Sequence, residues 1–400
     1  MSVGKTVRVL FSQGLRVFFL AAGIYALVAM GIWVTWLASL AATGEPPDVP
    51  FEPAPALWHA HEMIFGYAGA VIGGFFLTAV PSWTGAPAAR SWFLTLLAAA
   101  WLGGRLAVWW SGALDPIPVA VLDLSFLPLL AAKIAVQLAR RPKPQNLLFL
   151  VLISIVWIGN LMVHLDWTGL WPGRAATGLQ VGLLGVASMI MVISGRVTPA
   201  FTLNAMRQAG RETGLPRQRT SADRPAMAAA ILIPVSIGLG LPDLFVAAMA
   251  LIAGIGQLIR LAGWRGFWTL HAPILWSLHL AGAMLGLGYL AFAVSLAGWI
   301  TETGALHLIG IGAIGGMSLA MMSRAALGHT DRDIVAPRAV AWAYALVAIA
   351  AVIRAAGGEA GPGWYDWAML ISGALWLTAF ALFLTVYLPV LTSPATSRTP

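Results

Sequence analysis

The sequence predicts an all-α protein, a polytopic transmembrane helical bundle of about twelve spans with both termini in the cytoplasm. Hydrophobic residues make up 60% of the 400 residues and charged residues only 10%, whereas soluble domains carry roughly 25% charged residues. The mean hydropathy is +0.84. The apolar runs are long and continuous rather than alternating, which indicates helices rather than a β-barrel. Lipid must therefore solvate most of the chain, and helices satisfy the backbone polar groups internally.

Twelve apolar runs come close to the roughly 20 residues that a helix needs to cross a bilayer. The first run is too long for a signal peptide and lacks a cleavage site, so we count it as a span. The pair at 226–261 is weakest, because Pro242 and Asp243 interrupt it. We expect one transmembrane domain, residues 1–400, with spans at approximately 17–40, 57–80, 91–112, 117–139, 146–166, 177–201, 226–240, 242–261, 270–298, 303–323, 338–356 and 364–390.

The loops alternate in charge along the chain. Basic residues gather before the first span and in every second loop, most densely at 204–225, while the other loops carry acids such as Glu45, Asp115 and Glu359. The positive-inside rule places the basic loops and both termini in the cytoplasm. The net charge of +8 therefore reflects topology and contact with anionic lipid, and we expect no nucleic-acid partner.

The cysteine count is zero, which excludes thiolate-bound haem, iron–sulfur clusters, thiolate metal sites and disulfides. Histidine is then the natural ligand for haem iron, copper or zinc. The seven histidines fall into an outer layer and an inner layer, as a two-site redox protein would need. The outer layer is His59, His61, His164 and His307, and the inner layer is His271, His279 and His329. For His164 and His271 we favour plain hydrogen bonding between helices.

Strips of small residues run along the same helix faces as some of these groups. Glu62 and its neighbour His59 share a face with Gly66, Gly69 and Gly73; His279 shares one with Gly282, Ala283 and Gly286; His307 precedes four glycines at 310–316. Each strip fits a flat surface for a macrocycle beneath a histidine. Close packing of small residues between helices produces the same pattern, and the spacing does not separate the two.

Three arginines lie within or at the ends of the spans. Arg196 and Arg324 are at inner ends, where they either extend to lipid headgroups or bind haem propionates. Arg105 lies deeper and needs a partner, because an unpaired charge inside a bilayer is costly. Asp123 lies at a comparable depth in the next span and is the expected partner.

Several runs in the sequence resemble the NnrS family. They are WHAHEMIFGY at 58–67, GFFLTAVPSWTG at 74–85, GRVTPAFT at 195–202, LWSLH at 275–279 and GAIGGMSLAMMSRAALGHT at 312–330. One departure is Asp331, where the family pattern leads us to expect glycine. The resemblance extends over most of the chain.

The resemblance implies a bacterial inner-membrane protein of twelve helices that contains haem, with copper also reported in the family, and that acts in nitric-oxide stress or denitrification. We expect haem b, in more than one copy. The resemblance carries over to His59, His61, Glu62, His279, His307, Arg324 and His329.

The resulting hypothesis is haem-dependent handling of nitric oxide within the membrane, in its enzymatic form the reduction of two nitric oxides to nitrous oxide and water. Glu62 would deliver protons, and a quinol in the bilayer would supply electrons, although no specific quinone motif is present. Two alternatives remain: a nitric-oxide-binding or metal-handling protein without turnover, and a twelve-helix transporter with Pro-interrupted helices at Pro234 and Pro242.

The outer pair of histidines allows two arrangements. On a regular helix His59 and His61 point roughly 200° apart, so they would serve different centres. Alternatively, the prolines just before them delay the helix, His59 lies on a pre-helical turn, and both converge with His307 on one metal.

Overall fold

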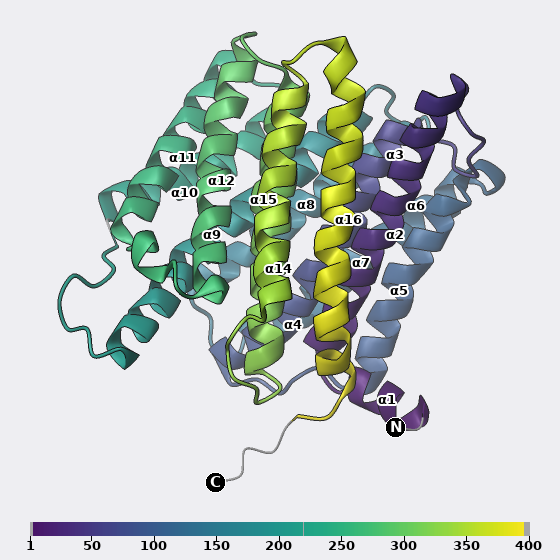
Figure 1. Ribbon diagram of the computed structural model, residues 1–400. Coiled ribbons are helices and arrows are strands. Elements are labelled where there is room, and N and C mark those ends of the chain that lie inside the picture. Colours follow the sequence, from purple (N-terminus) through teal and green to yellow (C-terminus); the bar gives the residue numbers. More distant parts are fainter. Residues whose placement is uncertain (1–2, 219, 396–400) are drawn as a thin grey trace. The chain divides into compact units, whose positions relative to one another are not determined.

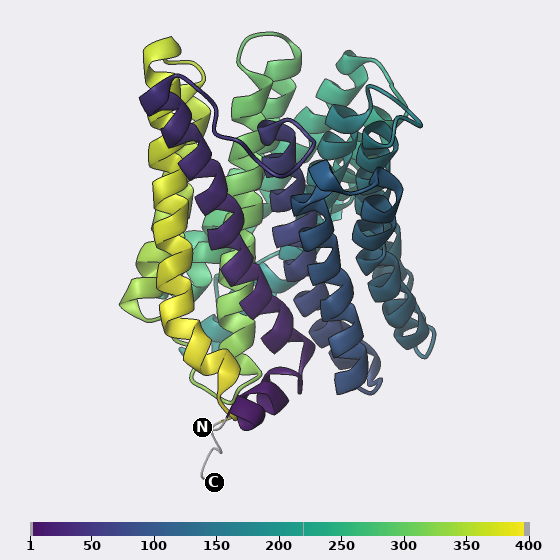
Figure 2. The same cartoon turned by 90° about the vertical axis from the view of Figure 1, so that its right-hand side faces the viewer.

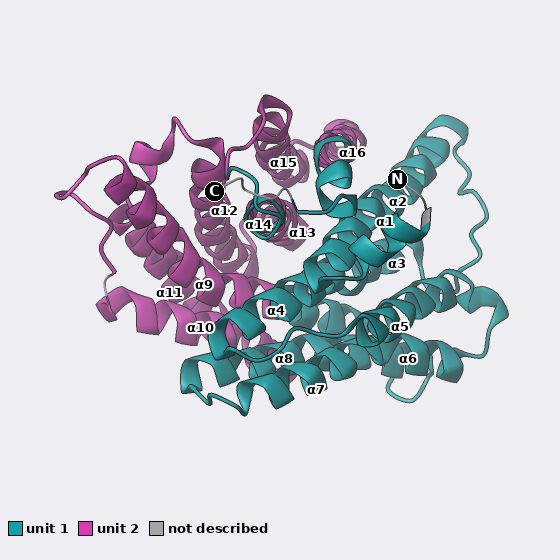
Figure 3. Cartoon of the chain, turned by 90° about the horizontal axis from the view of Figure 1, so that it is seen from below, with its two compact units in different colours: residues 1–183, 325–333, 384–400 teal, residues 184–324, 334–383 magenta. Residues whose placement is uncertain are grey.

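The computed structural model describes residues 3–218 and 220–395, whose regular elements are all helices, with no strand among them (Figure 1). The chain divides into two compact units (Figure 3). Unit 1 is residues 1–183, 325–333 and 384–400, and unit 2 is residues 184–324 and 334–383.

Unit 1 contains the first five predicted spans, whose helices contact one another in the pairs α2–α4, α4–α7, α5–α6 and α7–α8 (Figure 2). Its helices are α1 (Val3–Leu10), α2 (Gly14–Thr43), α3 (Pro55–His61), the π-helix η1 (Glu62–Ala68), α4 (Gly69–Thr84), α5 (Ser91–Trp109), the short 3₁₀ helix η2 (Ser111–Ala113), α6 (Pro116–Leu124), α7 (Phe126–Leu138) and α8 (Pro144–Trp167).

Unit 2 is built around α12, which contacts α11, α15 and the π-helix η4. Three further helices, α9 (Ala175–Gln208), α14 (Gly316–Gly328) and α16 (Pro362–Thr392), have residues in both units. The remaining helices are α10 (Thr220–Gly238), α11 (Asp243–Gly263), the 3₁₀ helix η3 (Gly266–Thr269), α12 (Pro273–Leu296), α13 (Glu302–His307), η4 (Leu308–Gly315) and α15 (Arg338–Gly357).

The helix ends follow local sequence signals. Proline occupies the first turn of α3, α6, α8 and α12, where its fixed φ suits a helix and its missing N–H leaves no bond unmade. Helices α2 and α4 end at Gly44 and Gly85, which have φ values of 74° and 68°. Each of these glycines donates its N–H back to a carbonyl four residues earlier, the usual glycine end of a helix.

Eleven helical stretches among the described residues are long and apolar enough to cross a membrane. They match eleven of the twelve predicted spans, and the fold class is confirmed. The exception is the predicted span 226–240, which corresponds to α10. This helix begins with Asp223, Arg224 and Pro225 in its first turns, so its apolar portion is shorter than the others. The predicted orientation depends on an even number of spans and stays a prediction.

Candidate functional site

Seven polar side chains meet inside unit 1 and form what we term the unit 1 polar cluster. They come from six elements, α2, α3, η1, α5, α6 and α8: Tyr25, His61, Glu62, Arg105, Asp123, Asn160 and His164. All except Tyr25 are buried, and the most accessible of these six, Arg105, retains 6% exposure. Such a concentration of ionisable groups within apolar helices is costly, which makes the cluster the candidate functional site.

Arg105 joins the two carboxylates of the cluster. One guanidinium nitrogen donates to Glu62 Oε1 at 2.8 Å, and the other forms an ion pair with Asp123 Oδ1. The expected pairing of Arg105 with Asp123 is therefore confirmed. Two glycines make the approach possible. A Cβ on Gly66 would lie 2.5 Å from the Tyr25 ring and 3.0 Å from Arg105, and one on Gly104 would lie 2.8 Å from the Asp123 carboxylate.

Glu62 accepts hydrogen bonds from three side chains. His61 Nδ1 and the Arg105 guanidinium share its Oε1, both at 2.8 Å, and the Tyr25 hydroxyl donates to its Oε2. Because an ionised carboxylate only accepts hydrogen bonds, His61 carries its hydrogen on Nδ1. Glu62 is thus held in one orientation by groups on three different elements.

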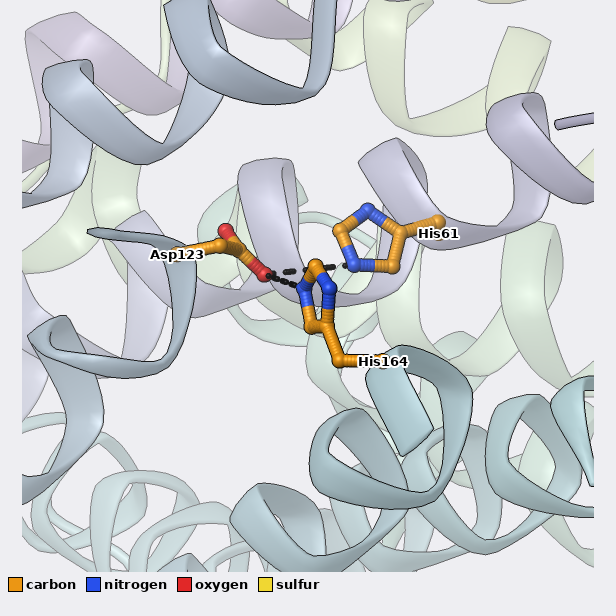
Figure 4. Close-up of side chains that lie close together, drawn as sticks. All are labelled: His61, Asp123 and His164. Carbon is orange, nitrogen blue, oxygen red and sulfur yellow. Dashed lines mark hydrogen bonds and ion pairs between the residues drawn. The ribbon is translucent and has the colours of Figure 1, made fainter. Parts of the chain in front are cut away.

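Asp123 lies where the side chains from the other side of the cluster meet. Its Oδ2 lies 2.8 Å from Asn160 Nδ2, 2.8 Å from His164 Nε2 and 3.3 Å from His61 Nε2. Figure 4 shows the two imidazole rings turned toward this carboxylate from different helices. One ligand atom from each of His61, Asp123 and His164 lies within 4.8 Å of the other two, so these three side chains have the geometry to hold a metal ion.

A π-helix presents the central pair of the cluster. The element η1 begins at Glu62, directly after His61, and its wider turn shifts the helix register at that point. The indole of Trp101 donates to the carbonyl of Gly66 within η1 at 2.9 Å. Single π-turns inside α-helices occur frequently at functional sites. A second π-helix, η4, begins directly after His307 in unit 2.

His59 lies apart from the cluster. It lies within α3, which starts at Pro55, so the pre-helical turn that one arrangement required is wrong. Its ring stacks on Trp33 with centroids 4.8 Å apart and planes at 13°, whereas His61 points into the cluster. The structure thus gives the two histidines separate surroundings. His307 belongs to unit 2.

In unit 2, His279 and His307 each have one ring nitrogen held by a hydrogen bond. The hydroxyl of Thr202 donates to the carbonyl of Thr198 at 2.9 Å, so it accepts from His279 Nε2, also at 2.9 Å. The buried Nδ1 of His279 then holds the lone pair, and it has no hydrogen-bond partner among the described residues. His307 donates Nδ1–H to the carbonyl of Thr303 at 2.7 Å, which leaves Nε2 as its lone-pair nitrogen.

These two histidines fit the expected haem on one criterion, because each keeps a ligand nitrogen while a hydrogen bond fixes its tautomer. Three other residues predicted to contact haem fit it less well. His329 is exposed after the end of α14. The guanidinium of Arg324 lies over the Phe201 ring at 3.8 Å, and Arg196 is half-buried on α9.

The strips of small residues are largely filled by neighbouring side chains. A Cβ on Gly282 would meet Gln257 and Leu261, and one on Gly286 would meet Leu258, because α11 packs closely on α12. In unit 1, Gly73 faces Phe18 and Phe126. Of the two interpretations left open by the spacing, these contacts favour close helix packing over a surface for a macrocycle.

Sequence reasoning did not assign Tyr25, Asn160, Asp123 or His164 to a metal or catalytic site. His164 does make the helix-to-helix hydrogen bond expected of it, to Asp123. The available signal was position: Asn160 and His164 are four residues apart on α8 and share a helix face, inside an otherwise apolar run. His271, by contrast, is exposed and packs edge-on against Trp268.

A protein-family model described as "NnrS protein" matches residues 9–395, nearly the whole chain. The search of curated proteins finds no match for the sequence.

Proposed function

The chain belongs to the NnrS family, membrane proteins linked to the nitric-oxide response, and we propose that it binds nitric oxide within the bilayer at haem and reduces it to nitrous oxide. The observation that supports this most strongly is the buried carboxyl group of Glu62. A carboxyl group that accepts three hydrogen bonds inside apolar helices suits a reaction that consumes protons away from water.

The proposed reaction combines two nitric oxides, two electrons and two protons into one nitrous oxide and one water. Bound haem would supply the iron that binds nitric oxide and carries electrons. His279 would hold one haem through Nδ1 and His307 a second through Nε2, and Arg196 and Arg324 would be available for haem propionates. A quinol in the membrane would be the electron donor.

Glu62, ionised at rest, would accept and pass on the two protons needed for each turnover. Tyr25 is the only partly exposed member of the unit 1 polar cluster, and its hydroxyl contacts Glu62 Oε2. A proton would therefore reach Glu62 through Tyr25. Arg105 and His61 position the carboxyl group and balance its charge when the proton leaves.

The test is an absorption spectrum followed by a consumption assay on the purified full-length protein. A Soret band and nitric-oxide consumption with a reduced quinol support the proposal. A Soret band without consumption means a nitric-oxide-binding protein, and no Soret band after growth with haem precursor leaves the transporter alternative.

Glu62→Gln tests the role of the carboxyl group. It keeps the shape and one acceptor oxygen but cannot carry a proton, so we expect consumption to fall by about 10²–10⁴-fold while haem content stays at the wild-type level. Glu45→Gln, at an exposed carboxyl group in a loop, is the matched control. Wild-type consumption by Glu62→Gln would remove the proton-delivery role, and loss of haem would make Glu62 structural.

A further inference from the structure

The unit 1 polar cluster contains an imidazole nitrogen that faces only acceptors. His61 carries its hydrogen on Nδ1, which donates to Glu62. Its Nε2 lies 2.9 Å from Asn160 Oδ1 and 3.3 Å from Asp123 Oδ2. In a neutral imidazole this Nε2 bears a lone pair, so three electron-rich atoms would face one another in a buried site.

The amide orientation of Asn160 does not relieve this conflict. Its Nδ2 donates to Asp123 Oδ2 at 2.8 Å, which directs its Oδ1 toward His61. Turning the amide over would direct Oδ1 at a carboxylate instead, and would lose the hydrogen bond to Asp123. The position beside His61 Nε2 therefore requires a positive centre, either a proton or a metal ion.

The surroundings favour a metal ion. His164 Nε2, from a third helix, lies 2.8 Å from the same carboxylate oxygen, Asp123 Oδ2. Adjacent ligand atoms that bind a first-row ion at about 2.0–2.2 Å lie roughly 2.8–3.4 Å apart, and the two distances from Asp123 Oδ2, 2.8 Å and 3.3 Å, fall in that range. A proton needs one acceptor, whereas this point collects two imidazoles and a carboxylate.

The ligands also have the outer hydrogen bonds that are typical of metal sites. His61 donates Nδ1–H to the Glu62 carboxylate, which fixes its tautomer and makes the ring a stronger ligand. The second oxygen of Asp123 pairs with Arg105, so the carboxylate is oriented too. The rings of Phe65 and Trp167 lie 5.0 Å and 4.9 Å from the His61 ring and provide an apolar wall.

We propose that His61 Nε2, His164 Nε2 and Asp123 Oδ2 bind one non-haem ferrous ion. Two histidines and one carboxylate, with no thiolate, form the ligand set that is typical of mononuclear non-haem iron(II), and this set leaves coordination positions open. A small neutral ligand such as nitric oxide binds at an open position. The site is independent of the haem proposed above, and each can fail without the other.

The experiment measures metal and nitrosyl binding in the full-length protein. The protein is purified in detergent, stripped with a chelator, reloaded anaerobically with ferrous salt and desalted. Iron is measured by mass spectrometry and haem by its pyridine adduct, so that non-haem iron is the difference. Nitric oxide is then added, and the electron paramagnetic resonance spectrum is recorded.

We expect about one non-haem iron per chain and the spin-quartet signal of a ferrous nitrosyl. His164→Asn should weaken iron binding by about tenfold or more, as loss of a ligand or of its support does. His271→Asn, at an exposed histidine outside the cluster, should keep the wild-type iron content. Both variants are compared with wild type by gel filtration, and the wild-type iron content and nitrosyl signal test the proposal even if His164→Asn does not fold.

Three results would overturn the proposal. One is a folded wild-type protein without non-haem iron after reloading, in which case His61 is a buried imidazolium. Another is reloaded non-haem iron that gives no ferrous-nitrosyl signal with nitric oxide, which would mean that the ion has no open coordination position. The third is an equal loss of iron from His164→Asn and His271→Asn, which would place the iron elsewhere.

Discussion

Replacing Arg105 by methionine tests whether the unit 1 polar cluster is held together by charge. Arg105 contacts Glu62 Oε1 at 2.8 Å and pairs with Asp123, and both carboxylates are buried. Methionine keeps an extended side chain of similar length but removes the charge, which leaves two buried carboxylates without their shared cation. Removing one partner of a buried pair costs about 3–5 kcal/mol, roughly two to four orders of magnitude in the folded-to-unfolded ratio.

The assay is unfolding in mixed micelles of increasing denaturing-detergent fraction, followed by tryptophan fluorescence. Arg90→Met is the matched control, because Arg90 is exposed just before α5, and it should change the free energy of unfolding by less than about 0.5 kcal/mol. The triple variant Arg105→Met, Glu62→Gln, Asp123→Asn should recover most of the loss, because no unpaired charge remains buried.

Two outcomes would refute the reasoning. If Arg105→Met unfolds within about 0.5 kcal/mol of wild type, the carboxylates are not ionised together in the folded protein. If the triple variant is as unstable as the single one, packing around the side chain matters and the charge does not.

Three further predictions follow from single residues. His279→Ala should reduce the haem content of protein that still inserts, because it removes a buried lone-pair nitrogen; full haem occupancy in the purified variant removes this residue from the ligand set. His61→Ala and His59→Ala should lose different spectroscopic signals, since His61 lies in the cluster and His59 stacks on Trp33; loss of the same signal in both contradicts the separate surroundings. The backbone N–H and hydroxyl of Thr301 donate to Glu359 and lower the pKa of the Glu359 carboxyl group from its usual 4.5. The ionised Glu359 therefore stabilises the fold above pH 4.5, and this stabilisation is lost as the pH falls through the lowered pKa. Glu359→Gln should accordingly lower the melting temperature at about pH 7 and leave it unchanged at about pH 2; an equal difference at both values would show that ionisation is irrelevant.

Hydropathy predicted the helical class and most spans because a segment that crosses lipid must be apolar along its whole length. Eleven of the twelve runs became helices long enough to cross, and the pairing of Arg105 with Asp123 followed from the cost of isolated charge. The weak seventh span was the one in which Asp223 and Arg224 shorten the apolar window.

The composition of the site was less predictable. Helical spacing shows which residues share a face on one helix, but not which neighbouring helix that face meets. Tyr25 and Asn160 joined the cluster through contacts between α2, η1, α6 and α8, and nothing in their own segments specifies those neighbours. The small-residue strips were ambiguous in the sequence for the same reason, because the side chains that pack against Gly282 and Gly286 lie on another helix, α11.

The π-helix after His61 makes the site sensitive to the length of the chain as well as to its residues. An α-helix turns by roughly 100° per residue, and η1 accommodates one extra residue between the paired groups and α4. Inserting one further residue between Met63 and Tyr67 would exceed what the π-turn absorbs and would rotate His61 and Glu62 by about that angle relative to α4. Both side chains would leave the cluster together while the span kept its apolar length. A one-codon insertion can therefore disconnect this site from an otherwise intact membrane scaffold.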